Sequence, residues 1–192
     1  SFAATKGLAY NIAPTVKVAV ASNGVKVAWN KIPGATSYIV YSSTYNAKTK
    51  KWSGLTNRGT VKTTNWTDTK AKSGTYYRYT VCAVNGKFVS EYKVSSAILY
   101  LAQPVVKVAN HANGAAVAWN KIAGATGYTI YRMEYNANTK TWSSWVNMGT
   151  IKKSTAVAWV DKSAKSGTYY RYTVRAVNGD VMSKYESTET LK

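Results

Sequence analysis

Catalysis in this chain would depend on seven carboxylates and a single imidazole, that of His111. Glycoside hydrolysis and other acid–base reactions need such groups in pairs that face one bond. His111 lies in the turn sequence NHANG, and Ala21 takes its place in the first half of the chain. Asp68 recurs as Asp161, and the simplest role for this repeated acid is at a turn or a strand end. Clustered metal ligands and glycine-rich phosphate loops are missing, so we expect no enzyme, no metal and no cofactor.

Binding offers more candidates, because flat aromatic side chains stack on sugars or bases while Arg and Lys pair with sulfate, carboxylate or phosphate. Many of these residues lie in or near the sequence AKSGTYYRYTV, which occurs at 71–81 and again at 164–174. A basic loop ahead of Trp52 adds three lysines. The candidate ligand-binding residues are Tyr41, Tyr45, Lys48, Lys50, Lys51, Trp52, Tyr76, Arg78, Tyr131, Tyr135, Trp142, Trp145, Tyr169, Arg171 and Arg175.

The chain consists of two copies of one unit. Pro14, Trp29, Tyr38 and Trp52 recur 90 residues later, and the offset becomes 93 at Asp68. The join LYLAQPV between the copies contains no Gly/Ser stretch. We predict a lead-in or linker at residues 1–13, a first domain at 14–101 and a second domain at 104–192.

Each unit reads as a series of short strands. Segments rich in Val, Tyr, Thr and Trp alternate with Asn, Gly, Lys and Ser, and no run has helical periodicity with caps. Seven such segments in each unit predict an all-β chain made of two tandem seven-stranded immunoglobulin-like β-sandwiches. Trp66 is the expected core residue of the strand within GTVKTTNWTDT.

Alternation within AKSGTYYRYTV assigns the binding candidates to one face. Tyr77, Tyr79 and Val81 share a parity, and this period of two predicts a strand with one buried face. Gly74 before it and Asn85-Gly86 after it favour turns. The outer face would then show Tyr41, Tyr45, Tyr76, Arg78 and Thr80 in the first unit and Tyr131, Tyr135, Tyr169, Arg171 and Arg175 in the second.

A simpler interpretation of this face stays open. Tyr, Thr and Arg are the residues that solvent-facing strands use for ordinary cross-strand pairs. On that interpretation Trp52 covers the edge of the sandwich and binds nothing.

The motifs of each unit together resemble the fibronectin type III domain. A lone tryptophan on the second strand, Tyr-x-Val or Tyr-x-Ile on the third, and then SGTYYRYTV followed by AVNG carry the resemblance over nearly the whole chain. It implies that Trp29 and Trp119 are core tryptophans. It also implies that Tyr77 and Tyr170 form the "tyrosine corner", in which the hydroxyl bonds to nearby backbone. The Lys- and Tyr-rich repeats of surface and secreted proteins of Gram-positive gut bacteria are the most similar group. The family's Leu-x-Pro before the glycine is replaced here by Lys70-Ala71-Lys72-Ser73.

Charge points to anionic partners. The chain has a net charge of +19, and the first unit carries 14 basic and 2 acidic residues, against 12 and 5 in the second. Nucleic acid, anionic glycans, teichoic-acid-like polymers and acidic membranes are the candidate partners, while a Lys-rich soluble surface without a partner is the alternative. The one cysteine, Cys82, lies on the outward parity and allows no disulfide within the chain. No apolar run is long enough to span a membrane.

Three functions follow as hypotheses. The first is adhesion, with mucin, glycosaminoglycans or cell-wall polymers held by the basic, aromatic surface of an extracellular bacterial surface or secreted protein. The second is a passive spacer that positions catalytic or carbohydrate-binding domains of a longer chain. The third is nucleic-acid binding, for which the charge suffices although no recognised motif is present.

Overall fold

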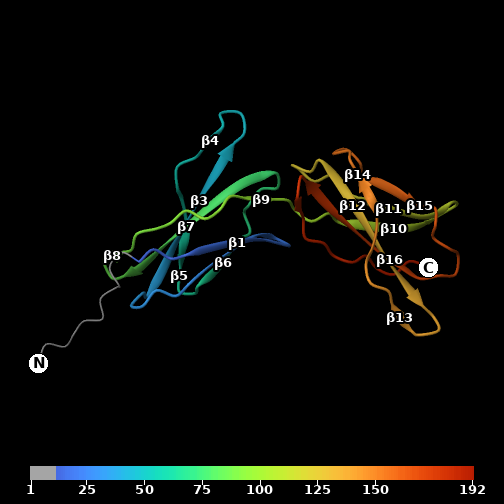
Figure 1. Ribbon diagram of the computed structural model, residues 1–192, viewed down its shortest axis with the longest axis horizontal. Coiled ribbons are helices and arrows are strands. Elements are labelled where there is room, and N and C mark those ends of the chain that lie inside the picture. Colours follow the sequence, from blue (N-terminus) through green and yellow to red (C-terminus); the bar gives the residue numbers. More distant parts are fainter. Residues whose placement is uncertain (1–11) are drawn as a thin grey trace, which may run out of the picture. The chain divides into compact units, whose positions relative to one another are not determined.

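All regular secondary structure in residues 12–192, the part of the chain that the structure describes, is β-strand (Figure 1). The structure is a computed structural model, and its chain divides into two compact units, Ser1–Tyr100 and Leu101–Lys192. Most of the lead-in predicted at residues 1–13 lies outside the described residues. No helix that could span a membrane occurs in residues 12–192.

The first unit has a three-stranded sheet whose outer strand begins just after Pro14. The sheet order is β1-β2-β6, all antiparallel, with β1 at the edge. A Cβ on Gly24 would lie 2.1 Å from the carbonyl oxygen of Asp68, so the close approach of β2 to β6 requires glycine there. The strands are β1 (Val16–Ala21), β2 (Gly24–Trp29) and β6 (Asn65–Asp68).

The second sheet of the first unit is built around two long central strands. Both β4 and β5 pair with one edge of β3, and both β8 and β9 pair with the far edge of β7. Each outer position is therefore split between two short strands, and the unit keeps the seven strand positions predicted from the sequence. The strands are β3 (Ser37–Asn46), β4 (Lys51–Trp52), β5 (Thr56–Val61), β7 (Thr75–Asn85), β8 (Phe88–Val89) and β9 (Ile98–Tyr100).

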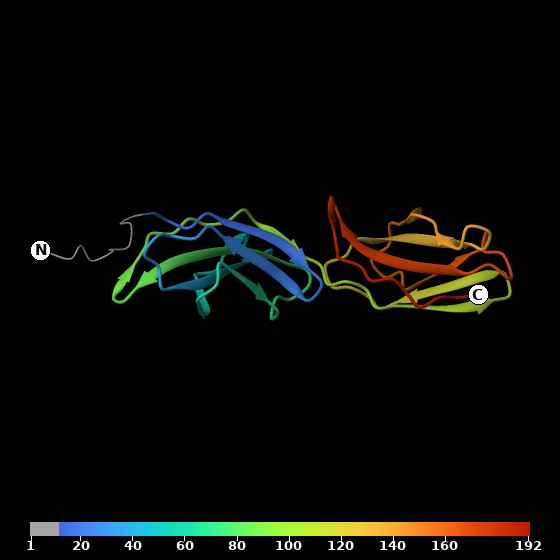
Figure 2. The ribbon, with the colours of Figure 1, turned by 90° about the horizontal axis from the view of Figure 1, so that it is seen from below.

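The second unit repeats this arrangement, and Figure 2 shows the layers of each unit from a second direction. Its sheets are β10-β11-β15 and β13/β14-β12-β16-β17, and a bridge between Tyr170 and Leu191 stands where β9 pairs in the first unit. The strands are β10 (Val106–His111), β11 (Gly114–Trp119), β12 (Gly127–Asn136), β13 (Thr141–Trp142), β14 (Val146–Ile151), β15 (Ala158–Asp161), β16 (Tyr170–Asn178) and β17 (Val181–Met182).

The core of each unit lies between its two sheets, as the alternation predicts. Trp29 packs edge-on against Tyr38 with ring centroids 5.5 Å apart, and Tyr79 and Val81 are fully buried beside them. Burial of side chains of this size stabilises by about 1.5–3 kcal/mol each. Trp66 is only half-buried, although its ring contacts that of Tyr79. Trp119, Tyr128, Tyr172 and Val174 repeat the arrangement in the second unit.

Both predicted tyrosine corners are confirmed. The hydroxyl of Tyr77 accepts a hydrogen bond from the backbone N–H of Lys72 at 2.8 Å, and that of Tyr170 accepts one from Lys165 at 3.0 Å. A second tyrosine lock, not predicted, joins the hydroxyl of Tyr38 to the N–H of Ile32 at 2.9 Å. These bonds fix the loops that lead into the central strands β3, β7 and β16.

Two outward predictions are wrong, because Thr80 and Cys82 are buried. The segment after β8 returns along β7, where the N–H of Ser90 bonds to Ala83 and the N–H of Ser95 bonds to Tyr79. These bonds hold the chain between the two serines alongside β7. Burial, together with the nearby charge of Glu91, raises the pKa of the Cys82 thiol.

Candidate functional site

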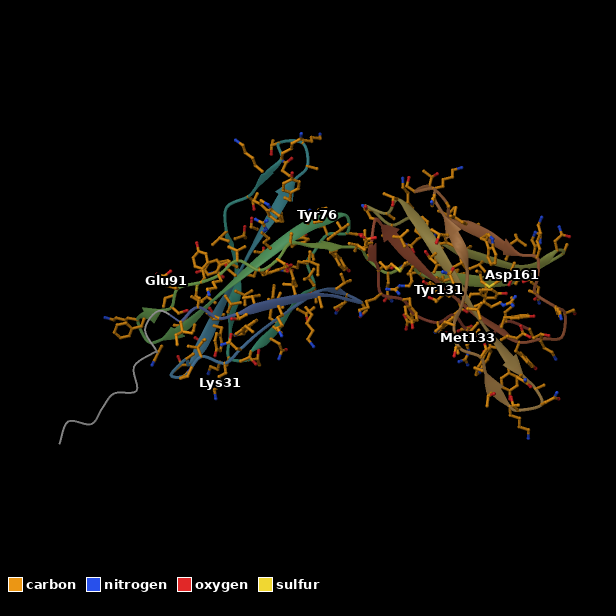
Figure 3. All side chains as sticks on the ribbon, in the orientation of Figure 1. Lys31, Tyr76, Glu91, Tyr131, Met133 and Asp161 are labelled. Carbon is orange, nitrogen blue, oxygen red and sulfur yellow. The ribbon has the colours of Figure 1, made fainter. Side chains whose placement is uncertain are left out.

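The outward aromatic residues of the first unit converge on one cluster, as their parity predicts. Tyr45 and Trp52 are register partners on β3 and β4, with ring centroids 5.4 Å apart. Tyr76, on β7, meets Tyr45 edge-on at 6.5 Å and remains 42% exposed (Figure 3). The guanidinium carbon of Arg78 lies 4.2 Å from the centre of the Trp52 ring. We call Tyr45, Trp52, Tyr76 and Arg78 the aromatic–arginine cluster of the first unit.

The second unit builds the equivalent cluster with nearly the same geometry. Tyr135 lies 5.4 Å from Trp142 and 6.2 Å from Tyr169, and Arg171 lies 4.4 Å above the Trp142 ring. Lys192 adds a second cation 5.2 Å from the Tyr169 ring. The repeated strand sequence therefore places the same four side-chain types together in both units.

In each cluster, the arginine stacked on the tryptophan limits which surfaces of the indole ring a ligand can reach. A guanidinium over an indole ring stabilises by about 0.5–1 kcal/mol at an exposed site and holds the cation in one place. One face of each tryptophan is thereby covered, and this face is unavailable to a sugar. Within residues 12–192 the guanidinium of Arg78 forms no hydrogen bond or ion pair, and its contact is with the Trp52 ring.

The basic hairpin loop beside the first cluster is preorganised by an asparagine. The Asn46 carboxamide oxygen accepts hydrogen bonds from the N–H groups of Lys48 and Thr49 at 2.9 and 3.1 Å. Lys50 adopts a left-handed conformation with φ of 55°, and Lys51 begins β4 next to Trp52. Lys48, Lys50 and Lys51 are all exposed.

The corresponding loop of the second unit has the same backbone and fewer charges. Asn136 makes the same two bonds, and Lys140 has the same φ of 55°. Asn138 and Thr141 stand in place of Lys48 and Lys51. The two loops therefore differ in charge while they share a shape.

An open hollow lies beside each cluster. That of the first unit, about 600 Å³, is lined by Tyr45 and by the cations Arg58, Lys70 and Lys72, with no carboxylate. That of the second unit, about 620 Å³, is lined by Arg132 and Glu134 among neutral residues. Sequence reasoning missed Lys70 and Lys72, although their spacing ahead of the tyrosine corner was a usable signal.

The remaining predicted residues do not join these clusters. Tyr131, Trp145 and Arg175 gather in a separate small pocket of the second unit, together with Tyr185 and Thr173, which were not predicted. Tyr185 recurs as Tyr92 in the first unit, a repeat that would have drawn attention to it. Tyr41 occupies the position of Tyr131 in the first unit and is half-buried.

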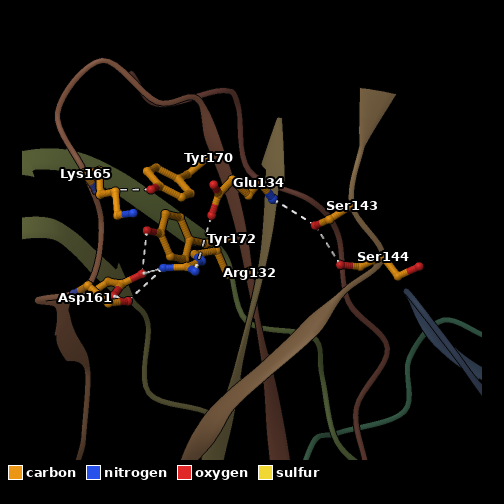
Figure 4. Close-up of polar contacts among 9 residues, drawn as sticks. Arg132, Glu134, Ser143, Ser144, Asp161, Lys165, Tyr170 and Tyr172 are labelled. Atoms are coloured by element: carbon orange, nitrogen blue, oxygen red, sulfur yellow. Dashed lines mark hydrogen bonds and ion pairs between the residues drawn. The ribbon is translucent and has the colours of Figure 1, made fainter. Parts of the chain in front are cut away.

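The repeated acid ends a strand in both units, as expected, and its carboxylate also belongs to a buried network. Asp161 is 1% exposed, and one carboxylate oxygen accepts hydrogen bonds from Arg132 and from the Tyr172 hydroxyl, each at 2.9 Å (Figure 4). The other oxygen accepts bonds from the N–H and the hydroxyl of Ser163. Burial alone would raise the pKa of this carboxyl, but bonds from Ser163, Arg132 and Tyr172 outweigh it and lower the pKa.

Asp68 occupies the same place in the first unit. It accepts a hydrogen bond from the Tyr79 hydroxyl at 3.0 Å and pairs with Arg58 at 3.4 Å. Burial and the charge of Asp68 raise the pKa of the Tyr79 hydroxyl, so this tyrosine stays a proton donor. A buried carboxylate saturated in this way is structural in character. Residues 12–192 hold no group of three or more His, Cys, Asp or Glu side chains that fits a metal ion.

No family model matches the chain. Mouse fibronectin type III domain-containing protein 7 is 25% identical over 179 residues, which cover 91% of this chain and 22% of that protein. The chain thus spans about a fifth of the length of this relative.

Two solved structures are similar in outline. A two-domain fibronectin type III segment of chicken tenascin has a TM-score of 0.46 and 16% identity, covering 94% of this chain and 99% of that one. The chicken interferon gamma receptor alpha chain has a TM-score of 0.49 and 10% identity, covering 92% and 96%. Strand order, core tryptophans and tyrosine corners identify the fold as two tandem fibronectin type III-type β-sandwiches.

Proposed function

We propose that this chain is a non-catalytic module of an extracellular protein that binds anionic glycans, such as mucin or glycosaminoglycans, through its first unit. The similarity to Lys- and Tyr-rich repeats favours a bacterial surface or secreted protein as its parent. Cell-wall polymers of the same charge are equivalent ligands in this proposal.

The basic hollow of the first unit carries the proposal. Arg58, Lys70 and Lys72 line it beside Tyr45, and no acidic residue does. Within residues 12–192 every ion pair uses Arg58 or Arg132, and no lysine is paired. Cations that remain unpaired attract a polyanion over the range of the Debye length, about 8 Å at physiological salt.

The aromatic–arginine cluster and the lysine loop extend this surface. Arg78 is held over Trp52 with its donors free, and Lys51 is the neighbour of Trp52 on β4. A sulfated or carboxylated sugar lying along the edge of β4 would meet cations from the loop, the cluster and the hollow in succession. Such a row of cations suits a polymer better than a single small ion.

The second unit provides the control for an experiment. We would replace Lys48 by Asn, Lys51 by Thr and Lys70 by Ser, the residues found at the matching positions of the second unit. This triple variant should elute from immobilised heparin and mucin at a lower salt concentration than the parent chain. Its affinity should also depend less steeply on salt. A second triple variant, Lys17→Gln, Lys26→Gln and Lys31→Gln, removes equal charge from the region of the other sheet.

Only a difference between the two triple variants supports the proposal. If both lower retention equally, binding is unspecific electrostatics and the site is wrong. Equal affinity of the parent chain for DNA and for every polyanion would have the same meaning, and it would revive the nucleic-acid hypothesis.

A passive spacer is the second candidate, and one observation favours it. Each tryptophan of the two clusters already carries an arginine on its face, and the same arrangement occurs in both units. Side chains that satisfy one another in this way also serve simply to cover a sheet edge. A glycan array to which the chain does not bind, at low salt, would select the spacer.

A further inference from the structure

The small pocket on the outer face of the second unit combines an aromatic corner with a cation that has free donors. It has a volume of about 110 Å³ and is lined by Tyr131, Trp145, Thr173, Arg175 and Tyr185. The rings of Trp145 and Tyr185 meet at 81° with centroids 5.9 Å apart, which makes two perpendicular apolar walls. The guanidinium carbon of Arg175 lies 5.6 Å from the Tyr185 ring.

The pocket is held in shape by the segment that carries Tyr185. Arg175 donates from Nε to the carbonyl oxygen of Ser183 at 2.9 Å, and Thr173 donates from its hydroxyl to the carbonyl oxygen of Glu186 at 2.7 Å. These two bonds anchor the backbone on both sides of Tyr185. They use only one nitrogen of Arg175, and neither Nη atom forms a hydrogen bond or ion pair with residues 12–192.

We propose that this pocket binds the carboxylate-bearing sugar at the end of an acidic glycan chain, a uronic or sialic acid. The two Nη atoms of Arg175 face the carboxylate in the paired geometry that guanidinium groups favour. The apolar face of the sugar ring lies against Trp145 and Tyr185. This inference rests on the proposed binding of anionic glycans and assigns one terminal sugar to the second unit, while the first unit takes the polymer.

Size and rigidity favour a terminal sugar. Pockets for drug-sized ligands have about 300–1,000 Å³, so 110 Å³ admits one acidic group and part of its ring. An acidic peptide side chain would bring the same carboxylate, but it loses about 0.5–1.5 kcal/mol of rotamer freedom when it is immobilised. A sugar acid carries its carboxylate directly on a rigid ring and avoids this loss.

The first unit lacks the pocket's two distinctive residues. Leu55 stands in place of Trp145 and Cys82 in place of Arg175, whereas Tyr41 and Tyr92 match Tyr131 and Tyr185. The chain thus supplies its own comparison, because the same strands and the same two tyrosines are present without the cation and the indole.

Calorimetry with a glucuronate-terminated disaccharide, and with the same disaccharide carrying neutral glucose instead, tests the assignment. We expect the whole chain to bind the acidic sugar at least about tenfold more tightly than the neutral one. Arg175→Gln should remove this preference, and Trp145→Leu should weaken binding about fivefold while leaving the Arg175–Ser183 bond in place. Leu55→Ala, the same kind of truncation in the first unit, should change nothing.

A second readout locates the binding. In NMR spectra, the indole N–H resonance of Trp145 is identified by its absence from Trp145→Leu. This resonance should shift on addition of the acidic disaccharide. Equal binding of both disaccharides, or an unchanged affinity in Arg175→Gln, overturns the assignment. An acidic tetrapeptide that binds more tightly and displaces the sugar shows that the pocket takes a peptide carboxylate. Polymer retention without disaccharide binding refutes this inference alone, whereas loss of both refutes the proposed function as well.

Discussion

The two units bury the same aspartate but neutralise it from different strands. In the first unit the guanidinium comes from Arg58 on β5, which also donates to Ser42 on β3 at 2.8 Å. In the second unit it comes from Arg132 on β12, at the position of Ser42, while Met148 takes the place of Arg58. The arginine thus comes from a different strand in each unit, but in both units its guanidinium lies beside the buried carboxylate.

This exchange shows what the fold requires at that point. A buried carboxylate left without a partner is costly, so some cation must reach it, but the packing of the sheet edge accepts that cation from either strand. Arg132 makes the tighter arrangement, at 2.9 Å with a side chain 16% exposed, against 3.4 Å and 24% for Arg58. Interactions of this kind are therefore conserved in space more strictly than in sequence.

The largest effect should come from breaking the tighter pair. Arg132→Ser leaves Asp161 buried without its cation, and we expect the second unit to lose about 3–5 kcal/mol of unfolding free energy. Adding Met148→Arg should restore most of this loss, since it reproduces the arrangement of the first unit. Amide hydrogen exchange, followed separately in β2–β6 and β11–β15, measures each unit within the intact chain.

The reciprocal exchange sharpens the same point. Arg58→Met should weaken the first unit by less than Arg132→Ser weakens the second, and Ser42→Arg should compensate. No rescue in either double variant would mean that the two arrangements are not interchangeable.

The tyrosine of the network should matter equally in both units. Tyr79→Phe and Tyr172→Phe each remove a hydrogen bond to a charged oxygen, with an expected loss of about 1.5–3 kcal/mol. The expected effects are equal because this contact, unlike the arginine, has kept its sequence position. Urea unfolding of the two single variants, compared with Tyr38→Phe as a tyrosine outside the network, provides the measurement.

Acid should act on the second unit through Asp161. The pKa of its carboxyl is lower in the folded chain than the ordinary value of 3.8 expected after unfolding. This group therefore contributes stability that is fully present above about pH 4 and is lost as the pH falls through the folded pKa. Asp161→Asn should flatten the acid limb of a plot of urea midpoint against pH; an unchanged slope would assign the acid sensitivity to other groups.

The smallest effect should come from the aromatic–arginine clusters. Arg78→Ala removes the cation over Trp52 at an expected cost of about 0.5–1 kcal/mol. Arg171→Ala should cost slightly more, because Arg171 also donates to the Thr190 hydroxyl at 3.1 Å. Thermal unfolding detects the difference, and equal losses would show that the bond to Thr190 contributes nothing.

Local pattern was enough to predict most of this fold. The period of two in AKSGTYYRYTV assigned Tyr77, Tyr79 and Val81 to the core, because a strand's side chains alternate whatever the rest of the chain does. The same parity brought Tyr45, Tyr76 and Arg78 onto one face, where they meet. Whether that face binds a ligand stays a prediction.

Features that depend on contacts between distant segments could not be predicted from local sequence patterns. Thr80 and Cys82 are buried on a stretch of β7 where a returning segment bonds to Tyr79 and Ala83, and no local sequence pattern predicts this path. The partner of Asp161 lies 29 residues away on another strand. Alignment of the two copies hid this partner, since its counterpart in the first unit is a serine.

The buried thiol of Cys82 can serve as a probe of local opening in the first unit. It is the chain's only cysteine, it is buried on β7 close to Ala83, to which Ser90 bonds, and its counterpart is Arg175. A thiol-specific reagent can therefore label the protein only when the first unit opens locally around this side chain. The rate of labelling therefore measures how often the first unit opens locally. The second unit does not contribute, because it has no cysteine.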